Sequence, residues 1–373
     1  MATNPNATLP PRSPAFHPRR ALAAHGVAAL AGAAFGCSSD PETSGSGTTT
    51  DTTTTGTSTS SSSSDTLSCS DDGDTSTATG DASADVLIGT FLVQLNEPRP
   101  ASNGSPETPG NTAVLGKVYD GPYPAQLVWE VDSTEGDCRL VKPRVPFCSV
   151  PCGGSAVCVE DDTCQDYPKG HSAGAVSIEG LATTAGATGI GMCPVANNYQ
   201  VPTGTTLNYP AFASGDDITL HADGDFYEAF DLSAKGIAQL VIASDTPELA
   251  ADQPVSLMWT IPEVAAAAKI HVKLDISHHG GTKGMIECDT DDDGLLEIPA
   301  ALVTKLLALG VAGFPSVFVT RKTVASTTIA PGRVDLVISS DVERTVTVAG
   351  LVSCTATTDC PDGQTCQDDL TCK

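Results

Sequence analysis

Cysteine spacing constrains this chain more than any other feature of its sequence. Eight of the 13 cysteines fall into two short clusters with nearly the same spacing. The clusters are Cys148-x3-Cys152-x5-Cys158-x5-Cys164 and Cys354-x5-Cys360-x5-Cys366-x5-Cys372. Each spans roughly twenty residues, too few to bury a useful apolar core, so cross-links have to hold it together. We therefore predict two disulfide-rich modules, residues 148–168 and 354–373, with pairing inside each.

Zinc binding is the rival interpretation of these clusters, because closely spaced thiolates also bind metal. Four-thiolate zinc sites usually have ligand pairs separated by two to four residues, followed by a longer gap. The regular five-residue spacing favours disulfides instead.

Four further cysteines lie outside the modules and outside the N-terminal region: Cys69, Cys138, Cys193 and Cys288. Together with the eight cysteines of the modules they make twelve, an even number that leaves out Cys37. We expect all twelve to be oxidised. The sequence leaves the pairing of these four open. So many paired cysteines indicate folding in an oxidising compartment.

Residues 1–36 have the composition of an export signal. They contain no Asp or Glu, and three arginines precede the short apolar run 21–35. A basic start, a short apolar core and a small residue before the cleavage point are typical of such signals. Arg19-Arg20 bears a faint likeness to a twin-arginine signal, but cysteines that pair outside the cytosol favour the general secretory route.

The end of this signal resembles the cleavage site of bacterial lipoproteins. The residues are Ala34-Phe35-Gly36-Cys37, and the resemblance implies that the Cys37 thiol is acylated and becomes the new N-terminus. The alternative is ordinary cleavage nearby, which would leave Cys37 as a free thiol.

Residues 37–84 follow as a segment rich in Ser, Thr, Gly, Asp and Ala. Such a composition cannot bury enough apolar surface to offset its ordering entropy. We predict a disordered linker that carries the lipid at its first residue and acts as a stalk.

Alternating apolar residues predict a β-rich body. Residues 270–276, 217–222 and 344–348 place apolar side chains at every second position, which is typical of antiparallel sheets with one buried face. Further strands are expected at 86–95, 127–131, 255–259, 316–320 and 333–339. One helix is expected, with Pro299 at its start, Leu302, Leu306 and Leu309 along one face, and Gly310 at its end.

These patterns predict an all-β fold with an antiparallel β-sandwich body. We divide the folded part into an N-terminal β-rich segment, 85–147, and a β-sandwich domain, 169–353, separated by the first cysteine module and followed by the second.

A resemblance to known proteins adds location but no activity. Cys360-Pro-Asp-Gly-Gln-Thr-Cys366 resembles a step of the small cysteine-rich repeats of the Dickkopf N-terminal type. The chain from residue 37 to 373 is similar to uncharacterised surface lipoproteins of the myxobacterial type. The segments that carry this similarity are 138–148, 275–281 and the C-terminal module.

The net charge of −26 argues against nucleic acid as a partner, because binding phosphates requires Lys and Arg. No stretch approaches the roughly 20 apolar residues that span a bilayer.

One motif invites a catalytic interpretation. Gly170-His171-Ser172-Ala173-Gly174 matches the G-x-S-x-G turn of α/β-hydrolases, which needs a strand before it and a helix after it. Here a cysteine module precedes Ser172 and an alternating, strand-like run follows it. We therefore expect a turn into a strand and no catalytic role.

Two motifs invite a metal-binding interpretation. Adjacent His278 and His279 resemble one histidine step of metallo-β-lactamase-fold hydrolases, but the other ligands of that family are not found, and we expect an exposed loop. Asp289, Asp291 and Asp293 precede Gly294 and fit the start of an EF-hand loop. The twelfth loop position is Ala300 rather than Glu, so we expect at most a weak calcium site on an acidic hairpin.

The sequence thus predicts an exported protein that is lipid-anchored at the bacterial outer membrane or cell surface and has a binding or structural role without catalysis. Its expected partners are the membrane, through the anchor, and an unknown protein or glycan ligand. Apart from weak calcium, no cofactor is expected. Two alternatives stay open. One is a secreted hydrolase, either a serine hydrolase using Ser172 or an enzyme using the His278–His279 region. The other is a disulfide-rich protease inhibitor or ligand-binding protein.

Overall fold

The structure is a computed structural model that describes Cys69 and residues 76–80, 82–101, 106–125, 127–264 and 267–373. The predicted signal peptide, the lipidation site Cys37 and most of the predicted linker lie outside these residues. The described part of the chain is mostly β-structure and contains one α-helix. The all-β prediction is confirmed.

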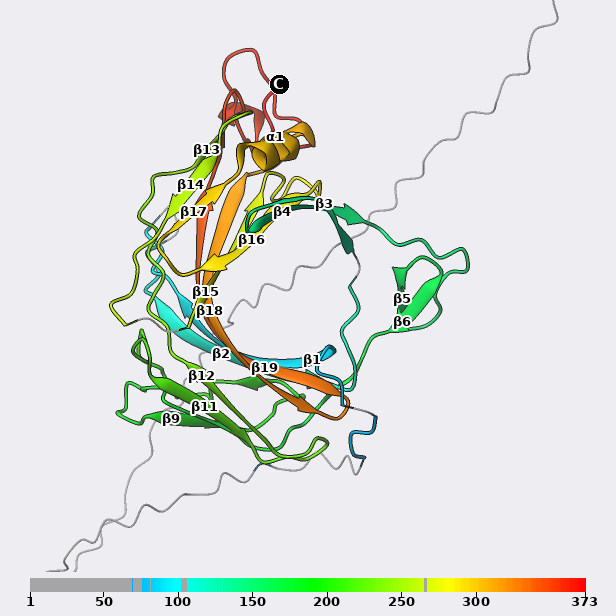
Figure 1. Ribbon diagram of the computed structural model, residues 1–373, viewed down its shortest axis with the longest axis vertical. Coiled ribbons are helices and arrows are strands. Elements are labelled where there is room, and N and C mark those ends of the chain that lie inside the picture. The colour runs from blue at the N-terminus through cyan, green and yellow to red at the C-terminus, as the bar shows by residue number, and fades with distance from the viewer. Residues whose placement is uncertain (1–68, 70–75, 81, 102–105, 126, 265–266) are drawn as a thin grey trace, which may run out of the picture. The chain divides into compact units, whose positions relative to one another are not determined.

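A ten-stranded sheet is the largest element of the fold (Figure 1). Its strand order is β10-β2-β1-β19-β18-β15-β16-β4-β3, and β7 pairs separately with β2. Neighbours are antiparallel except β1 and β19, which run parallel, so the predicted antiparallel arrangement has one exception in this sheet. The strands are β1 Leu87–Asn96, β2 Asn111–Tyr119, β3 Val128–Glu135, β4 Cys138–Arg144, β7 Gly170–His171, β10 Tyr199–Gln200, β15 Lys269–Asp275, β16 Met285–Asp291, β18 Ser316–Ile329 and β19 Gly332–Thr345.

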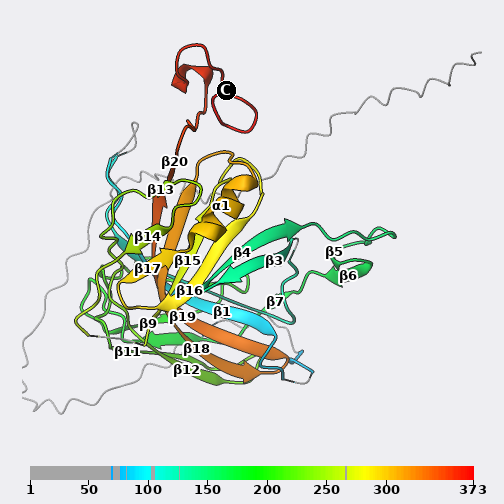
Figure 2. The same cartoon turned by 45° about the horizontal axis from the view of Figure 1, so that its top comes forward.

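The β18–β19 hairpin joins the two halves of this sheet. Both strands have 14 residues, and they pair along their whole length. The first half of β18, from Ser316 to Lys322, pairs with β15, whereas β1 pairs with β19 from Arg333 to Asp341. The two long strands can be followed side by side in Figures 1 and 2.

A first hydrophobic core lies between this sheet and a second, four-stranded sheet of order β12-β11-β8-β9. Alternation buries every second residue, as in β11, where Ile218, Leu220 and Ala222 face the core. They meet Phe91 of β1 and Leu336 of β19. This is the predicted β-sandwich. The added strands are β8 Val176–Glu179, β9 Gly189–Met192, β11 Asp217–Ala222 and β12 Phe230–Lys235.

A second core lies against β15, β16, β18 and β4. Its cover is formed by two short strand pairs and helix α1, Ala300–Ala308. The pairs are β14 Val255–Met258 with β17 Leu295–Ile298, and β13 Glu248–Leu249 with β20 Thr347–Val348.

Helix α1 matches the prediction closely. Pro299 is its N-cap, and Gly310 follows the C-cap with a φ of +86°, a conformation that favours glycine. Leu302 and Leu306 are buried as expected, and Val303 joins them.

Both cysteine modules are small, disulfide-linked units. The first contains the hairpin of β5 Ala156–Glu160 and β6 Thr163–Asp166, and the second contains a 3-10 turn at Thr357–Asp359. Corresponding residues of the two modules, Asp162 and Leu370, have nearly the same positive φ, 58° and 60°. The repeat seen in the sequence is therefore also a repeat of backbone conformation.

The strands of residues 85–147 and those of 269–345 belong to the same ten-stranded sheet. The sequence analysis assigned them to separate segments because the first cysteine module lies between them in the chain. Pairing of β1 with β19 and of β4 with β16 joins them in space.

Candidate functional site

Both hydrophobic cores lie on the same face of the ten-stranded sheet. Side chains alternate between the faces of a strand, and on β19 Leu336, Ile338 and Val342 point into the cores. Asp341 and Glu343 of the same strand therefore face the opposite side. This second side, which we call the open face, carries mainly polar residues.

The open face is hollowed where β1 ends beside β18 and β19, and the hollow reaches the edge of β19 beyond Asp341, where Val342 and Arg344 also take part in its lining. The cavity has a volume of about 910 Å³, within the roughly 300–1,000 Å³ of typical ligand sites. We call it the β1–β19 groove. Its lining residues are Gln94, Asn96, Glu97, Pro98, Arg99, Pro100, Phe318, Thr320, Asp341, Val342, Glu343, Arg344 and Thr345.

Hydrogen bonds fix the polar lining of the groove. Gln94 Nε2 donates to Asp341 Oδ2, and Asn96 Nδ2 donates to Asn111 Oδ1 over 2.9 Å. Arg344 binds both oxygens of Glu97, at 2.6 and 3.0 Å. This hydrogen bonding raises the pKa of Arg344. Side chains held in this way are already oriented before a ligand arrives.

An aromatic ring, Phe318, forms part of the same lining and is half-buried. The His278 ring meets it edge-on with centroids 5.5 Å apart, and Lys273 Nζ lies 5.8 Å from its centroid. His278 Nε2 also lies 3.8 Å from Glu343 Oε1. The histidine predicted for an exposed loop is thus packed beside the groove.

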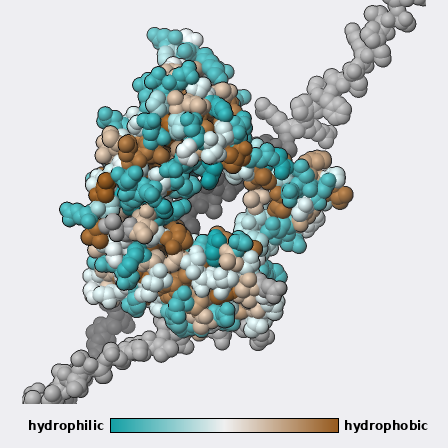
Figure 3. Space-filling model, in the orientation of Figure 1, coloured by the Kyte–Doolittle hydropathy of each residue, from teal (hydrophilic) through white to brown (hydrophobic). Residues whose placement is uncertain are grey.

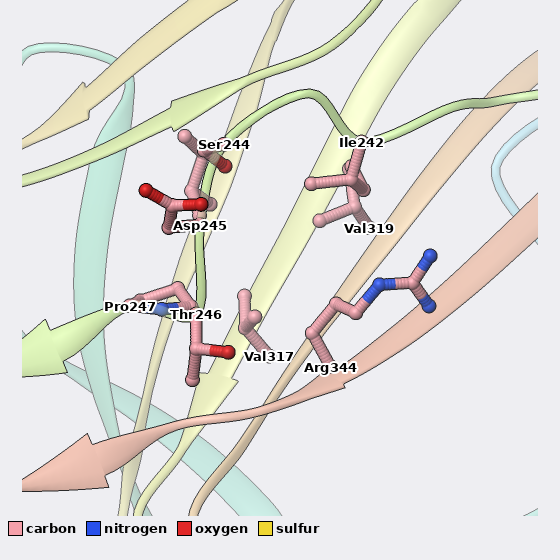
Figure 4. A pocket seen from close by; sticks show the side chains of 9 residues that line it. Ile242, Ser244, Asp245, Thr246, Pro247, Val317, Val319 and Arg344 are labelled. Atoms are coloured by element: carbon pink, nitrogen blue, oxygen red, sulfur yellow. The ribbon is translucent and has the colours of Figure 1, made fainter.

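A smaller cavity of about 270 Å³ also has Arg344 in its lining. Figure 4 shows Ser244, Asp245 and Thr246 on the loop at one side, and Val317, Val319 and Arg344 on the strands opposite. Its strand side is apolar apart from Arg344. Arg344 therefore lines both cavities: the smaller one, whose strand residues are otherwise apolar, and the polar β1–β19 groove.

Ser172 lies between two strands, β7 and β8, and not between a strand and a helix. Its Oγ accepts a hydrogen bond from the amide of Gly174 over 3.0 Å. Close by, the Tyr199 hydroxyl accepts from the Ala173 amide and donates to the Gly174 carbonyl. Burial raises the pKa of Tyr199, so its hydroxyl stays protonated and can donate. These contacts hold a turn, and the strand–turn–helix of a nucleophile elbow is not formed here.

His278 and His279 occupy a tight loop after β15. Their ring centroids are 3.9 Å apart, and His279 has a φ of 63°. The amide of Phe314 donates to the His278 carbonyl over 2.8 Å, which packs this loop against the segment after α1. Within the described residues, no third potential ligand from Asp, Glu or Cys joins them in a metal-type group.

The acidic turn does not bring its predicted calcium ligands together. Asp289 Oδ1 accepts from His271 Nδ1 over 2.8 Å, and Asp291 pairs with Lys269. Asp293 Oδ1 accepts from the amide of Leu295 at the end of the hairpin. Each of the three carboxylates has a partner of its own, and within the described residues they do not form a group of three potential metal ligands.

Asp292, which fits no motif in the sequence, has the buried side chain of that turn. Asp292 is 7% exposed and binds Arg321, which is 1% exposed, through both carboxylate oxygens at 2.7 and 2.9 Å. Trp259 Nε1 also donates to it over 2.7 Å. The sequence does contain a signal for this pair. Arg321 falls at the next core-facing position after Val317 and Val319, and a buried cation needs an acidic partner.

The twelve cysteines that the structure describes are all paired. Each module has the same connectivity, first to third and second to fourth, in agreement with the predicted pairing inside modules. Cys138–Cys288 joins β4 to β16, and Cys69 pairs with Cys193. Sulfur atoms of three cysteines come within 4.8 Å of one another in each module, because two disulfides lie close together. A disulfide sulfur is not a thiolate, so these groups do not form the zinc site of the rival interpretation.

Six disulfides indicate a protein that is exported and folds in an oxidising compartment. None of the helices in the described residues is long and apolar enough to cross a membrane.

Comparison with known proteins identifies no family for this chain. No family model matches it, and no curated protein matches it. Among solved structures, the crystal structure of the FN1–FN3 domains of chicken CNTN1 is similar over 63% of this chain and 74% of that chain. The TM-score is 0.16 and the sequence identity 7%. At that level the similarity carries no argument about fold or function.

Proposed function

We propose that this protein is an exported, lipid-anchored surface protein that binds a ligand on the open face of its ten-stranded sheet. The observation that carries the proposal is the β1–β19 groove, where amide, carboxylate, guanidinium and aromatic side chains converge in one cavity. Convergent polar groups in a preformed hollow are typical of binding sites.

The groove supports recognition rather than proton transfer. Glu97 is paired with Arg344, and Asp341 accepts hydrogen bonds from Gln94 and Ser339. The third groove carboxylate, Glu343, lies 3.8 Å from His278 Nε2. A general base has to reach a substrate proton with a free lone pair. Carboxylates already engaged by neighbours suit the orientation of a ligand better.

The N-terminal sequence supports presentation at a surface. Residues 1–36 have the features of an export signal, and Gly36-Cys37 resembles a lipoprotein cleavage site. The Cys69–Cys193 disulfide attaches the end of the predicted linker to the fold, so the free part would be 37–68, with an average span on the order of 30 Å by square-root scaling. This reach would hold the groove clear of the membrane, in keeping with the myxobacterial-type surface lipoproteins that the chain resembles.

Detergent-phase partitioning of cell extracts tests the anchor. The wild-type protein is expected in the detergent phase, and Cys37→Ser in the aqueous phase, because the acyl chains supply about 0.8 kcal/mol per buried CH₂. Partitioning is independent of ligand binding, since the groove is unchanged in the variant. If Cys37→Ser enters the detergent phase as fully as the wild type, the anchor is not at Cys37.

Binding itself is tested with the same Cys37→Ser protein. Purified envelopes from cells that lack the protein are mixed with it and sedimented. We expect saturable co-sedimentation, and its loss in the additional variant Arg99→Ala, which alters an exposed wall of the groove. The matched control is Leu115→Ala, which is 53% exposed on the open face and is not part of the groove lining. Equal sedimentation of all three proteins, or of none, would contradict the proposal.

A further inference from the structure

The ligand class can be narrowed from the charge of the β1–β19 groove. The whole chain carries a net charge of −26, yet the groove lining has three carboxylates, Glu97, Asp341 and Glu343, against two guanidinium groups, Arg99 and Arg344. Lys273 and His278 lie beside Phe318 at the same place. The lining is therefore close to neutral on a strongly acidic protein. A charged ligand would find little opposite charge here to attract it. Binding of a neutral polar ligand does not depend on such attraction.

The position of the groove within the sheet narrows the class further. Most of the groove floor is made of residues that are paired on both sides, from Gln94 to Asn96 of β1, Phe318 and Thr320 of β18, and Asp341 of β19. Their backbone amides and carbonyls are used by the ladder, whereas residues 342–345 of β19 pair with β18 alone. Extended peptides usually bind by adding a strand to a free edge, where main-chain hydrogen bonds supply much of the affinity. The doubly paired part of the groove floor offers side chains only, so a ligand that lies on it is recognised through side-chain contacts.

The chemistry of those side chains matches a sugar. Hydroxyl groups both donate and accept hydrogen bonds, and the amides of Gln94 and Asn96, the carboxylates of Asp341 and Glu343 and the guanidinium of Arg99 supply partners of both kinds. A pyranose ring also presents a face of C–H groups that packs on an aromatic ring, and Phe318 supplies one in the same lining. The cavity volume of about 910 Å³ is enough for a ligand of more than one ring.

We infer that the β1–β19 groove binds a neutral oligosaccharide. Gln94, Asn96 and Arg99 hydrogen-bond its hydroxyls, and Phe318 contacts the apolar face of one sugar ring. The inference rests on the proposed function, since it assigns a ligand class to the same site.

Isothermal titration calorimetry of the full Cys37→Ser protein tests the inference. The probes are maltotetraose, cellotetraose and chitotetraose, with tetragalacturonate as a charged saccharide and a neutral octapeptide for the peptide class. At least one neutral tetrasaccharide is expected to bind saturably, and more tightly than tetragalacturonate or the peptide.

Two groove variants and one control locate the binding. Gln94→Ala combined with Phe318→Leu is expected to weaken saccharide binding at least tenfold. Because Phe318 is half-buried, Arg99→Ala serves as a second variant at an exposed position and should weaken binding at least threefold. Leu115→Ala should bind within twofold of the parent protein. Circular dichroism and thermal melting check that each variant is folded.

The outcomes separate the inference from the proposed function. If no neutral tetrasaccharide binds while envelope binding still depends on Arg99, the ligand class is wrong and the binding function stands. Tighter binding of the peptide or of tetragalacturonate would likewise overturn the ligand class. If saccharides bind with equal affinity to the parent and both groove variants, the site is wrong. Loss of envelope binding in the parent protein would remove the proposed function itself.

Discussion

Arg321 shows how a single residue determines the role of a surface turn. Its guanidinium is 1% exposed and binds Asp292 together with the carbonyls of Gln239 and Thr260, at 3.0 and 2.7 Å. A buried cation is costly unless its hydrogen bonds are satisfied and an opposite charge accompanies it. The acidic turn after β16 therefore has a structural task, which is to place one carboxylate in the second core.

We predict that Asp292→Ala lowers the free energy of unfolding by about 3–5 kcal/mol, because it leaves a buried guanidinium unpaired. The matched control is Asp291→Ala, one residue away, whose side chain is 76% exposed. It should cost less than about 1 kcal/mol. Urea unfolding followed by fluorescence measures both. Similar losses in the two variants would mean that the buried pair contributes little.

At the residue level, the acidic turn was predictable from the sequence, but the structural role of Asp292 within it was not. Motif matching selected Asp289, Asp291 and Asp293 by their spacing. The deciding fact is a partner 29 positions away, Arg321, which spacing within the turn cannot reveal. The groove residues Gln94 and Asn96 gave no motif either, since each is simply a polar position in an alternating strand.

The C-terminal module illustrates how one element is attached to another. The amide of Gly313 donates to the Asp369 carbonyl over 2.7 Å, and Ser353 Oγ donates to the Gly313 carbonyl over 2.6 Å. Gly313 has a φ of +60°, and a Cβ there would lie 2.0 Å from the His278 carbonyl oxygen. The turn that carries Asp369 is held by hydrogen bonds from Lys373 and Thr371, which lower the pKa of the Asp369 carboxyl to about 2.

This lowered pKa predicts an acid-sensitive module. A carboxyl whose pKa falls on folding stabilises the folded state at any pH above its pKa in the unfolded chain, which is 3.8. This stabilisation is lost as the pH drops from 3.8 towards about 2. Hydrogen exchange should therefore report falling protection of amides in 354–373 across this window. Asp369→Asn should show weaker protection at neutral pH and little further change in acid. Asp368→Asn, its neighbour, should behave like the wild type; a wild-type profile that is flat across the window would contradict the prediction.

Element types were predictable here to the extent that local periodicity encodes them. Helix α1 and strands such as β11 follow directly from the spacing of their apolar residues. The alternation expected at 316–320 and 333–339 marks only part of β18 and β19, because Thr, Ser and Lys continue the strands without an apolar contrast. The parallel pairing of β1 with β19 joins residues more than two hundred positions apart, and no local pattern specifies it.

At the scale of the whole molecule, the two cores of the described residues lie against one face of a single sheet, and the other face carries the β1–β19 groove. The long β18–β19 hairpin makes this possible, since it spans both cores and places β1 beside it. In Figure 3, hydrophilic and hydrophobic residues are interspersed over the visible surface of the described residues. Composition and cysteine spacing predicted an exported, disulfide-rich β-protein. They could not predict which face stays open, because that depends on the order of strands in the sheet.

Arginine footprinting tests whether the protein works through the groove on this open face. Arg99 is an exposed residue of the groove lining, whereas Arg139, with its side chain 42% exposed, lies on β4 towards the far edge of the same sheet. The Cys37→Ser protein is labelled with a dicarbonyl reagent, alone and bound to purified envelopes, and modification of each arginine is read by mass spectrometry. Our account predicts that envelope binding protects Arg99 at least fivefold and leaves Arg139 unchanged. Unaltered labelling of Arg99 in the bound protein, or protection confined to Arg139, would contradict it.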